Sequence, residues 1–298
     1  MAGLCFSIIF GFSFMFTKEA LEVIDPFLLL ALRFLLAATT LTLLKITGLV
    51  RMNFKGKKLS LVFLLALFQP VFYFIFETVG INLTTSSEAG LMISLIPVAV
   101  TILAALILNE KPGGCQLVFI ILSVAGVIFI VLMKSQSAVS NNYRGMALLG
   151  GAVVMAGFYN ILSRRLSFSF KPVEITYIMM WAGALVFNGI ALIRHNLEWE
   201  IYLTPVRHLS VGVSVLYLGL LSSIVAFFMM NYTLSRIRAF ESAVFANLVT
   251  VVSIMAGVVF RNEPFYWFQV IGAVMIIIGV WGTNYYGKLR QRSDKIPA

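Results

Sequence analysis

The sequence predicts an all-α membrane protein of ten transmembrane helices, arranged as two five-helix repeats of inverted topology. Three observations support this prediction. Hydrophobic residues make up 60% of the 298 residues and charged residues only 11%, whereas a soluble domain carries roughly 25% charged residues. Ten apolar segments fill the chain between polar breakers. Spaced motifs in the first half also recur in the second. So few charges cannot cover a water-facing surface, so we expect lipid to surround most of the protein.

Crossing the hydrocarbon core takes about 20 largely apolar residues. The segments that approach this length are residues 2–20, 26–47, 59–80, 84–108, 113–133, 145–164, 172–194, 208–233, 239–260 and 264–286. Four prolines mark helix starts: Pro26, Pro112, Pro172 and Pro264. Proline has no backbone N–H, and in the first turn of a helix that N–H would have no partner within the helix. The first segment lacks a basic start and a cleavage pattern, so we expect a retained helix. Its shortness leaves open a start a few residues upstream.

Basic residues fix the expected orientation. The net charge of +10 comes mostly from lysines and arginines in short loops, such as Arg51 to Lys58, and in the C-terminal tail. More of these basic residues fall in loops on the same side of the membrane as the N-terminus than in loops on the opposite side. Loops rich in lysine and arginine stay in the cytoplasm. We therefore expect both termini in the cytoplasm and the protein in the plasma (inner) membrane. The charge fits an anionic membrane face, and no basic domain is present that could bind nucleic acid.

The repeat rests on motifs that recur at a fixed offset. Adding 153 carries Glu88 onto Glu241 and Glu110 onto Glu263, while adding 146 carries Pro26 onto Pro172. Each half then holds five helices, an odd number, so the second half must cross the membrane upside down. The expected units are a repeat at 1–134, a linker at 135–144, a repeat at 145–287 and a basic tail at 288–298. Such inverted repeats are typical of secondary transporters, which bind substrate near the midplane.

Polar side chains on apolar segments must face protein or water, because lipid cannot satisfy them. Those that we expect around a central cavity are Ser13, Tyr73, Glu77, Ser94, Tyr159, Asn160, Trp181, Asn231 and Asn247. Glu77 shares a helical face with Gln69 and Tyr73 and is the leading candidate for charge or proton coupling. Contact with headgroup water is the alternative for Glu77, since it lies near the outer end of its segment.

Small residues let membrane helices approach closely. We expect Gly90 and Pro97 in the fourth segment, and Ala243 and Thr250 in the ninth, to lie at a helix break or at the symmetry axis. Simple close packing is the favoured alternative for the small residues. Pro97 frees a backbone carbonyl that a ligand could use. Thr250 stands at the corresponding place, so the two halves differ there.

Four glutamates lie near helix starts, and helix-start chemistry accounts for them. Glu88 completes a capping-box pattern with Thr85, and Glu241 lies in a first turn, where negative charge is favoured. Glu110 and Glu263 flank the following helices. We favour structural roles for all four over substrate or proton binding.

Arg33 lies about seven residues into the second segment, where an unpaired charge is costly. It can extend its side chain to the interface, pair with an acid such as Glu77 or Glu88, or bind an anionic group of a substrate. An internal pair is the favoured choice.

Motifs of hydrolytic and nucleotide-driven chemistry are absent from the sequence. It contains no Walker A loop, no His-Glu-x-x-His and no carboxylate cluster spaced for a metal. It also offers no nucleophile–base pair. Cys5 and Cys115 lie in apolar runs and make no disulfide framework. We therefore expect no catalysis, no metal and no cofactor.

Several short motifs together resemble one known family. They are Arg33-Phe34, Leu95-Ile96-Pro97, Asn109-Glu110-Lys111, Ser163-Arg164-Arg165, Asn231-Tyr232 and Asn262-Glu263-Pro264. In order and spacing the chain is similar to the EamA-type ten-helix transporters of the drug/metabolite transporter superfamily, from about Phe10 to Tyr286. The resemblance implies a 5+5 inverted repeat around a cavity and export of amino acids, other metabolites or toxic compounds. It also implies peripheral fifth and tenth helices. The chain departs from the pattern at Thr250, Phe10 and Ala156.

The prediction is a secondary transporter that exports small metabolites, such as amino acids, by alternating access. One alternative is an exporter of lipophilic or cationic drugs, which the 26 phenylalanines favour if many line the cavity. The other is a membrane scaffold or sensor without transport. The expected partners are a small-molecule substrate and the lipid bilayer, with the proton as candidate coupling ion and a homodimer left open.

Overall fold

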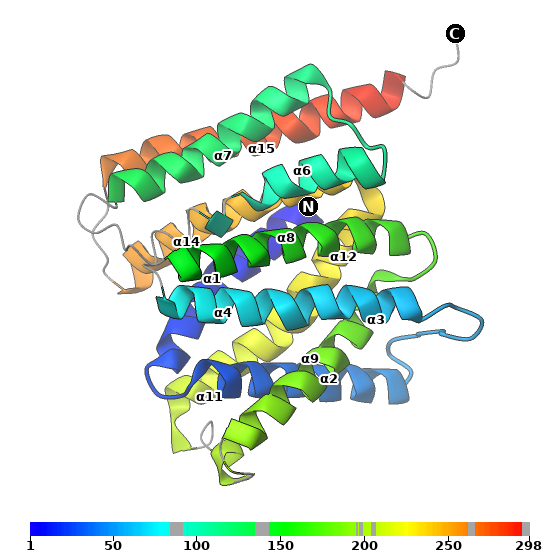
Figure 1. The fold of residues 1–298 in the computed structure, drawn as a ribbon, viewed down its shortest axis with the longest axis vertical. Coiled ribbons are helices and arrows are strands. Elements are labelled where there is room, and N and C mark those ends of the chain that lie inside the picture. The colour runs from blue at the N-terminus through cyan, green and yellow to red at the C-terminus, as the bar shows by residue number, and fades with distance from the viewer. Residues whose placement is uncertain are drawn as a thin grey trace.

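The computed structural model describes residues 1–83, 92–93, 95–134, 143–194, 196, 199–203, 207–261 and 266–293 (Figure 1). These residues form helices and connecting turns, with no strand among them. The elements are α1 Ala2–Leu21, α2 Pro26–Ile46, α3 Ser60–Ala66, η1 Leu67–Phe72, α4 Tyr73–Leu83, α6 Ile96–Ile107, α7 Gly114–Lys134, α8 Tyr143–Leu166, α9 Pro172–Arg194, η2 Trp199–Leu203, α11 Leu209–Leu216, η3 Tyr217–Ala226, α12 Phe227–Arg236, α13 Ala239–Ala243, α14 Phe245–Arg261 and α15 Trp267–Ser293.

Many of these helices are long and apolar enough to cross a membrane. Within the described ranges, eight helical stretches, some of them kinked, meet that condition: Ala2–Leu21, Pro26–Ile46, Ser60–Gly80, Tyr143–Leu166, Pro172–Arg194, Leu209–Arg236, Ala239–Phe260 and Trp267–Gly287. Two shorter apolar helices, Ile96–Ile107 and Gly114–Ile130, fall in the fourth and fifth expected segments. Most of the first half of the fourth segment lies outside the described residues. The class predicted from composition, an all-helical membrane protein, agrees with this architecture.

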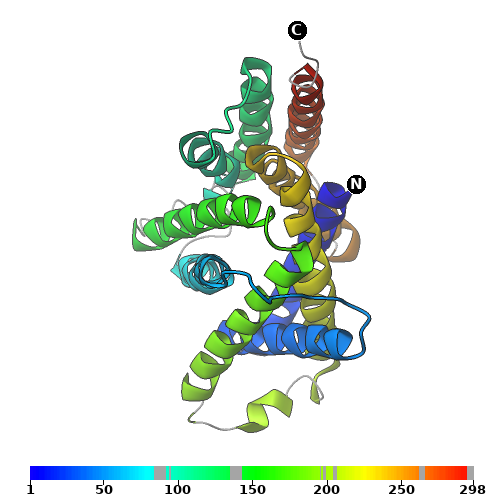
Figure 2. The same cartoon turned by 90° about the vertical axis from the view of Figure 1, so that its right-hand side faces the viewer.

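The helices form a layered bundle. In Figure 1, α7 and α15 run along each other at one edge of the molecule and α2 crosses α9 at the opposite edge, while α1, α4, α6, α8, α12 and α14 lie between them. The view turned by 90° shows the same two outer pairs (Figure 2). Most of the largest fully buried side chains, among them Phe34, Tyr159, Phe227 and Phe240, lie in one core cluster in this bundle.

Helix starts follow the capping signals in the sequence. The Asp25 carboxylate accepts a hydrogen bond from the backbone N–H of Phe27 at 2.9 Å, and Pro26 occupies the first turn of α2. At the start of α9, Glu174 accepts the backbone N–H of Lys171 and that of Asn53, each at 2.9 Å. Glu174 also pairs with Lys57. These contacts tie the basic loop after α2 to the start of α9.

Two expected helices are interrupted. Pro70 lies inside the segment expected as a single helix over 59–80. Proline has no N–H and clashes with the preceding turn. The helix accommodates it in the π-type element η1, where Gln69 takes an extended backbone conformation at φ −149° and ψ 122°. The ninth segment is likewise divided, at Val244, into α13 and α14.

The outer pair of α7 and α15 depends on glycine. A Cβ atom added to Gly126 would lie 2.8 Å from the backbone oxygen of Gly272, so the two backbones are in contact. In lipid no hydrophobic effect draws helices together, and close backbone approach at small residues supplies packing instead. Gly126 and Gly272 therefore set the separation of this pair.

We expect Gly126→Ala to push α7 away from α15. The added methyl group meets backbone, which cannot rotate aside, and overpacking of this kind costs about 1–3 kcal/mol. Thermal unfolding of the detergent-solubilised protein should therefore show a lower midpoint. Gly189→Ala is the matched control, because a Cβ there meets nothing within 4 Å. Equal midpoints for both variants would contradict the proposed close contact.

Candidate functional site

Arg33 is a buried cation with neutral partners. It lies in α2 at 6% exposure. Its Nε donates to Ser223 Oγ and its Nη2 to Ser222 Oγ, each at 3.1 Å. The guanidinium carbon lies 5.2 Å from the ring centre of Phe34 and 5.4 Å from that of Phe74. Cation–π attraction and two hydroxyls thus hold the charge in place.

Among the described residues, Arg33 has none of the acid partners that were expected for it. No carboxylate of the described residues lies within 4.0 Å of the guanidinium. Glu77 is close enough to interact electrostatically with it but not to pair. Glu88 lies outside the described residues. The two hydroxyls of η3 take the place of the predicted acid, because they come from the helix packed against this face of α2.

Tyr73 and Glu77 form a polar pair on α4. The Tyr73 hydroxyl donates to Glu77 Oε1 at 2.9 Å. Tyr73 is buried, whereas Glu77 keeps partial exposure. Gln69, expected on the same face, is buried at 7% exposure, and its Oε1 has no hydrogen-bond partner among the described residues.

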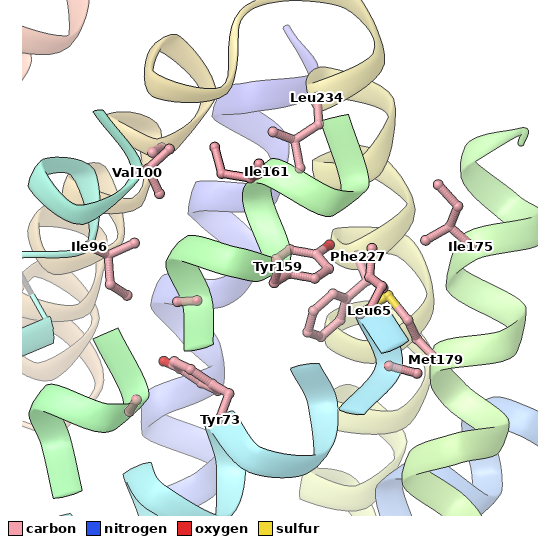
Figure 3. Packing of buried hydrophobic residues seen from close by; sticks show 14 of the residues in the cluster. Leu65, Tyr73, Ile96, Val100, Tyr159, Ile161, Ile175, Met179, Phe227 and Leu234 are labelled. Carbon is pink, nitrogen blue, oxygen red and sulfur yellow. The ribbon is translucent and has the colours of Figure 1, made fainter. Parts of the chain in front are cut away.

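A second polar group lies in the centre of the bundle. Asn231 Oδ1 accepts the hydroxyl of Tyr159 at 3.0 Å and that of Ser163 at 2.6 Å, and its amide donates to Thr176 at 3.1 Å. Figure 3 shows Tyr159 beside Phe227, with Tyr73 on a neighbouring helix. Tyr159 and Asn231 are fully buried. In this conformation they join α8, α9 and α12, and their cavity-lining role stays a prediction.

The remaining predicted lining residues are spread over other helices. Trp181 donates from its ring nitrogen to Thr42 Oγ1 at 3.0 Å, which links α9 to α2. Ser13 donates to the carbonyl of Phe10 in its own helix at 2.7 Å. Ser94 lies outside the described residues.

Two buried amides complete the predicted set. Asn247 donates to Ser123 Oγ at 3.1 Å, linking α14 to α7. Asn160 donates to the carbonyl of Ala156 at 2.8 Å, and its Oδ1 has no partner among the described residues. An unpaired buried acceptor is unfavourable, so Asn160 keeps hydrogen-bonding capacity that the described residues do not use.

The residues predicted at the symmetry axis are only partly described. Pro97 lies in the first turn of α6, where its missing donor is harmless, and its carbonyl accepts the hydroxyl of Thr101 at 2.7 Å. Ala243 is buried at the end of α13, which packs against α6, and Thr250 lies in α14. Gly90 lies outside the described residues. An axis through these positions stays a prediction.

The helix-start glutamates have the structural contacts that were expected of them. Glu241 accepts the backbone N–H of Arg238 at 3.1 Å in a capping box and the Gln116 amide at 3.0 Å. Glu110 pairs with Arg164 Nε at 3.0 Å and accepts the backbone N–H of Ala239 at 2.9 Å. Glu88 and Glu263 lie outside the described residues.

Glu110 joins element ends from both halves of the chain. Asn109, just after α6, adopts a left-handed backbone at φ 55°, and Glu110 follows it. Arg164, at the end of α8, binds Glu110 and also donates to the carbonyl of Leu234 near the end of α12 at 3.0 Å. We name Glu110, Arg164, Ala239 and Leu234 the helix-end cluster. It connects the ends of α6, α8 and α12 and the start of α13.

Sequence patterns missed several polar partners. Ser222 and Ser223 stand in an apolar run, Gln116 opens α7, and Thr42 and Thr176 lie on apolar faces. Each is a lone polar residue in a membrane segment, which is the available signal, but the partner of each is far away in the chain. Only packing shows that they satisfy Arg33, Glu241, Trp181 and Asn231.

Apolar helices of membrane-spanning length and polar groups satisfied inside the bundle define a polytopic integral membrane protein. The model of the EamA-like transporter family matches residues 1–132 and 143–285. The chain therefore belongs to the EamA-like transporter family, within the drug/metabolite transporter superfamily. Membership of this family implies a small-molecule substrate.

Individual relatives agree with this assignment. A Bacillus subtilis protein described as an uncharacterized transporter, YcxC, is 38% identical over 300 residues, covering 100% of this chain and 96% of the relative. The "Probable amino-acid metabolite efflux pump" of Escherichia coli is 24% identical, covering 97% and 95%. The "Probable terminal-alkyne amino-acid exporter" of Streptantibioticus cattleyicolor is 24% identical, covering 71% and 68%.

A solved crystal structure has the same fold. It superposes with a TM-score of 0.80 at 19% sequence identity, covering 95% of this chain and 96% of the other. At that identity the likeness concerns the fold alone.

We expect Glu110→Gln to weaken the helix-end cluster. The substitution removes the charge that Arg164 and the Ala239 N–H share, and a hydrogen bond to a charged group contributes about 1.5–3 kcal/mol. Thermal unfolding in detergent should show a lower midpoint than for the native chain. Glu200→Gln is the control, since Glu200 is exposed in η2. A midpoint equal to the control's would show that the cluster adds no stability.

Proposed function

We propose that this transporter exports small metabolites such as amino acids by alternating access, and that it is built as a 5+5 inverted repeat. The observation that carries the substrate class is that two relatives aligned over most of the chain are described as amino-acid exporters. The architecture is supported by which elements touch and by where glycines allow close approach.

Contacts between helices repeat under exchange of the two halves. If the ten segments are numbered in order, the third packs on the sixth through α4 and α8, and the eighth packs on the first through α12 and α1. The fourth packs on the sixth through α6 and α8, and the ninth on the first through α14 and α1. The pairs α2 with α9, α7 with α15 and α6 with α13 map onto themselves. An inverted repeat produces this pattern.

Close glycine contacts repeat in the same way. A Cβ on Gly11 would meet Val252, and one on Gly157 would lie 3.6 Å from Ala99. The offset of 146 relates Gly11 to Gly157, and the offset of 153 relates Ala99 to Val252. The contact of Gly11 with Val252 in one place thus corresponds to the contact of Gly157 with Ala99 in the other. This correspondence supports a duplicated five-helix unit, with one copy at residues 1–134 and the other at residues 145–287, joined by the linker at 135–144.

Membrane orientation completes the proposal. With basic loops inside, both termini face the cytoplasm of a cell whose plasma membrane holds the protein. The helix-end cluster then lies on the cytoplasmic side, near the basic ends of α8 and α12. The ion pair across it fits a conformation closed towards the cytoplasm. The proton is the coupling ion that we propose.

Counterflow into proteoliposomes tests the substrate class. Vesicles holding the purified chain are loaded with each of the twenty standard amino acids, and entry of the labelled compound is followed. We expect exchange of at least one amino acid above the rate of empty vesicles. Exchange or binding of hydrophobic cations with none of amino acids would instead favour a drug exporter. Absence of exchange across a broad metabolite panel would favour a scaffold or sensor.

We expect Glu77→Gln to slow transport and to flatten its dependence on pH. The amide keeps the shape of Glu77 and its contact with Tyr73, but it can neither carry a charge nor exchange a proton. Initial rates in proteoliposomes between pH 5 and 8 measure the effect, with Glu200→Gln as control. An unchanged rate and pH dependence would exclude the coupling role.

A further inference from the structure

The Arg33 side chain has more hydrogen-bond donors than the protein uses. A guanidinium carries five N–H donors and is never neutral in practice. Only Nε and Nη2 have acceptors among the described residues, Ser223 and Ser222, so Nη1 donates to none. A buried charge normally binds an opposite charge, because two neutral hydroxyls offset little of its desolvation. Arg33 thus keeps donors that an anionic ligand can use, since the described residues place no carboxylate in direct contact with it.

Glu77 has an unused hydrogen-bond acceptor, which complements the unused donors of Arg33. Its Oε1 accepts the Tyr73 hydroxyl, while Oε2 has no partner among the described residues and the side chain remains partly exposed. Arg33 lies seven residues after the start of α2 and Glu77 six residues before the end of α4. At 1.5 Å per residue, these positions lie about 10 Å and about 9 Å from the ends of their helices. Both helix ends belong to the same side of the membrane, so the two charges share a depth.

Aromatic rings lie beside the guanidinium and on the Glu77 face of α4. Phe74 lies beside the guanidinium and three residues before Glu77, so on α4 it shares a face with the carboxylate. Phe34 meets Phe74 edge to face, with ring centres 5.6 Å apart. Aromatic surroundings lower the local dielectric and so strengthen an interaction of either charge with a ligand.

We propose that Arg33 and Glu77 are the two ends of a zwitterion-binding site. Arg33 binds the α-carboxylate of an amino acid through its unused donors, and Glu77 binds the α-ammonium group through Oε2. The inference rests on the proposed export of amino acids and adds the residues that recognise the backbone of the substrate. A direct pair between the two side chains would leave neither available. No ion pair within 4.0 Å joins them, so both charges stay available to a ligand.

The arrangement also accounts for selectivity by charge. A guanidinium fork binds carboxylate in bidentate geometry, which an ammonium cannot reproduce. Compounds that lack the carboxylate would leave the buried charge of Arg33 without its ligand, and those that lack the ammonium group would leave Glu77 without its ligand. They should bind more weakly even when their side chain is identical.

Binding of matched analogues to the purified full chain in detergent tests the site. The probe is the standard amino acid that the native chain binds most tightly. It is compared with the amine that lacks its carboxylate and with the carboxylic acid that lacks its ammonium group. We expect the native chain to prefer the amino acid over each analogue by about 30-fold or more, the range found when one partner of a buried charge pair is removed.

The variants separate recognition from folding. We expect Arg33→Gln to abolish the preference for the amino acid over the amine, and Glu77→Gln to abolish the preference over the carboxylic acid. Arg33→Lys should restore part of the first preference, because it keeps the charge but not the fork. The double variant Ser222→Ala with Ser223→Ala should retain both preferences, and Arg194→Gln, on the exposed end of α9, serves as control.

The measured preferences distinguish a substrate-binding role of Arg33 and Glu77 from a packing role. Loss of one preference with the other retained, in the variant that predicts it, supports the site. If Arg33→Gln and the double serine variant weaken the binding of all three compounds equally, Arg33 has a packing role and the proposed site is wrong. The proposed site is also wrong if the native chain binds none of the twenty amino acids. If the native chain binds an amino acid with these preferences but shows no counterflow, export is wrong and the binding site stands.

Discussion

The constraint on which this structure depends is that lipid offers no hydrogen bonds. Each polar side chain in a spanning helix must therefore find a partner inside the bundle. Asn231 meets this requirement with three partners from α8 and α9, and Glu241 with a capped backbone and the amide of Gln116. These ties fix how helices that are otherwise uniformly apolar are arranged around one another. A uniformly apolar bundle would have little to distinguish one packing arrangement from another.

Against that background, the incompletely satisfied groups are informative. Most of the buried polar side chains have a partner in the protein, but within the described part of the chain Arg33 has unused donors, and Glu77 and Asn160 have unused acceptors. Leaving such groups unpaired is unfavourable, so their persistence calls for a ligand, water or another conformation that satisfies them. This separates residues that hold the bundle together from residues that are available for binding. Tyr159 and Asn231 fall in the first group in this conformation, although sequence patterns place them with the second.

The fold could be predicted from the sequence further than the site. Apolar segment lengths, and prolines such as Pro26 and Pro172, predict the helices and their starts because these signals are local. The break at Gln69 and Pro70 was missed because the apolar pattern continues through it. Partners could not be predicted at all: Arg33 was expected to meet an acid and meets Ser222 and Ser223, which lie about 190 positions away in the chain. Hydrogen bonds of that kind depend on which helix faces pack together, and composition does not encode this.

Duplication and divergence act on different properties of the chain. The close contacts of Gly11 with Val252 and of Gly157 with Ala99 relate corresponding positions of the proposed repeat, which is what a duplicated scaffold would give. The charge does not repeat. The offset that carries Pro26 onto Pro172 carries Arg33 onto Met179, a fully buried apolar side chain. In the proposed mechanism, a symmetric scaffold lets the two halves rock about a shared centre, whereas a charged group on one half alone fixes the direction in which a zwitterion must lie. The proposal thus assigns symmetry to the movement of the protein and asymmetry to its recognition of substrate.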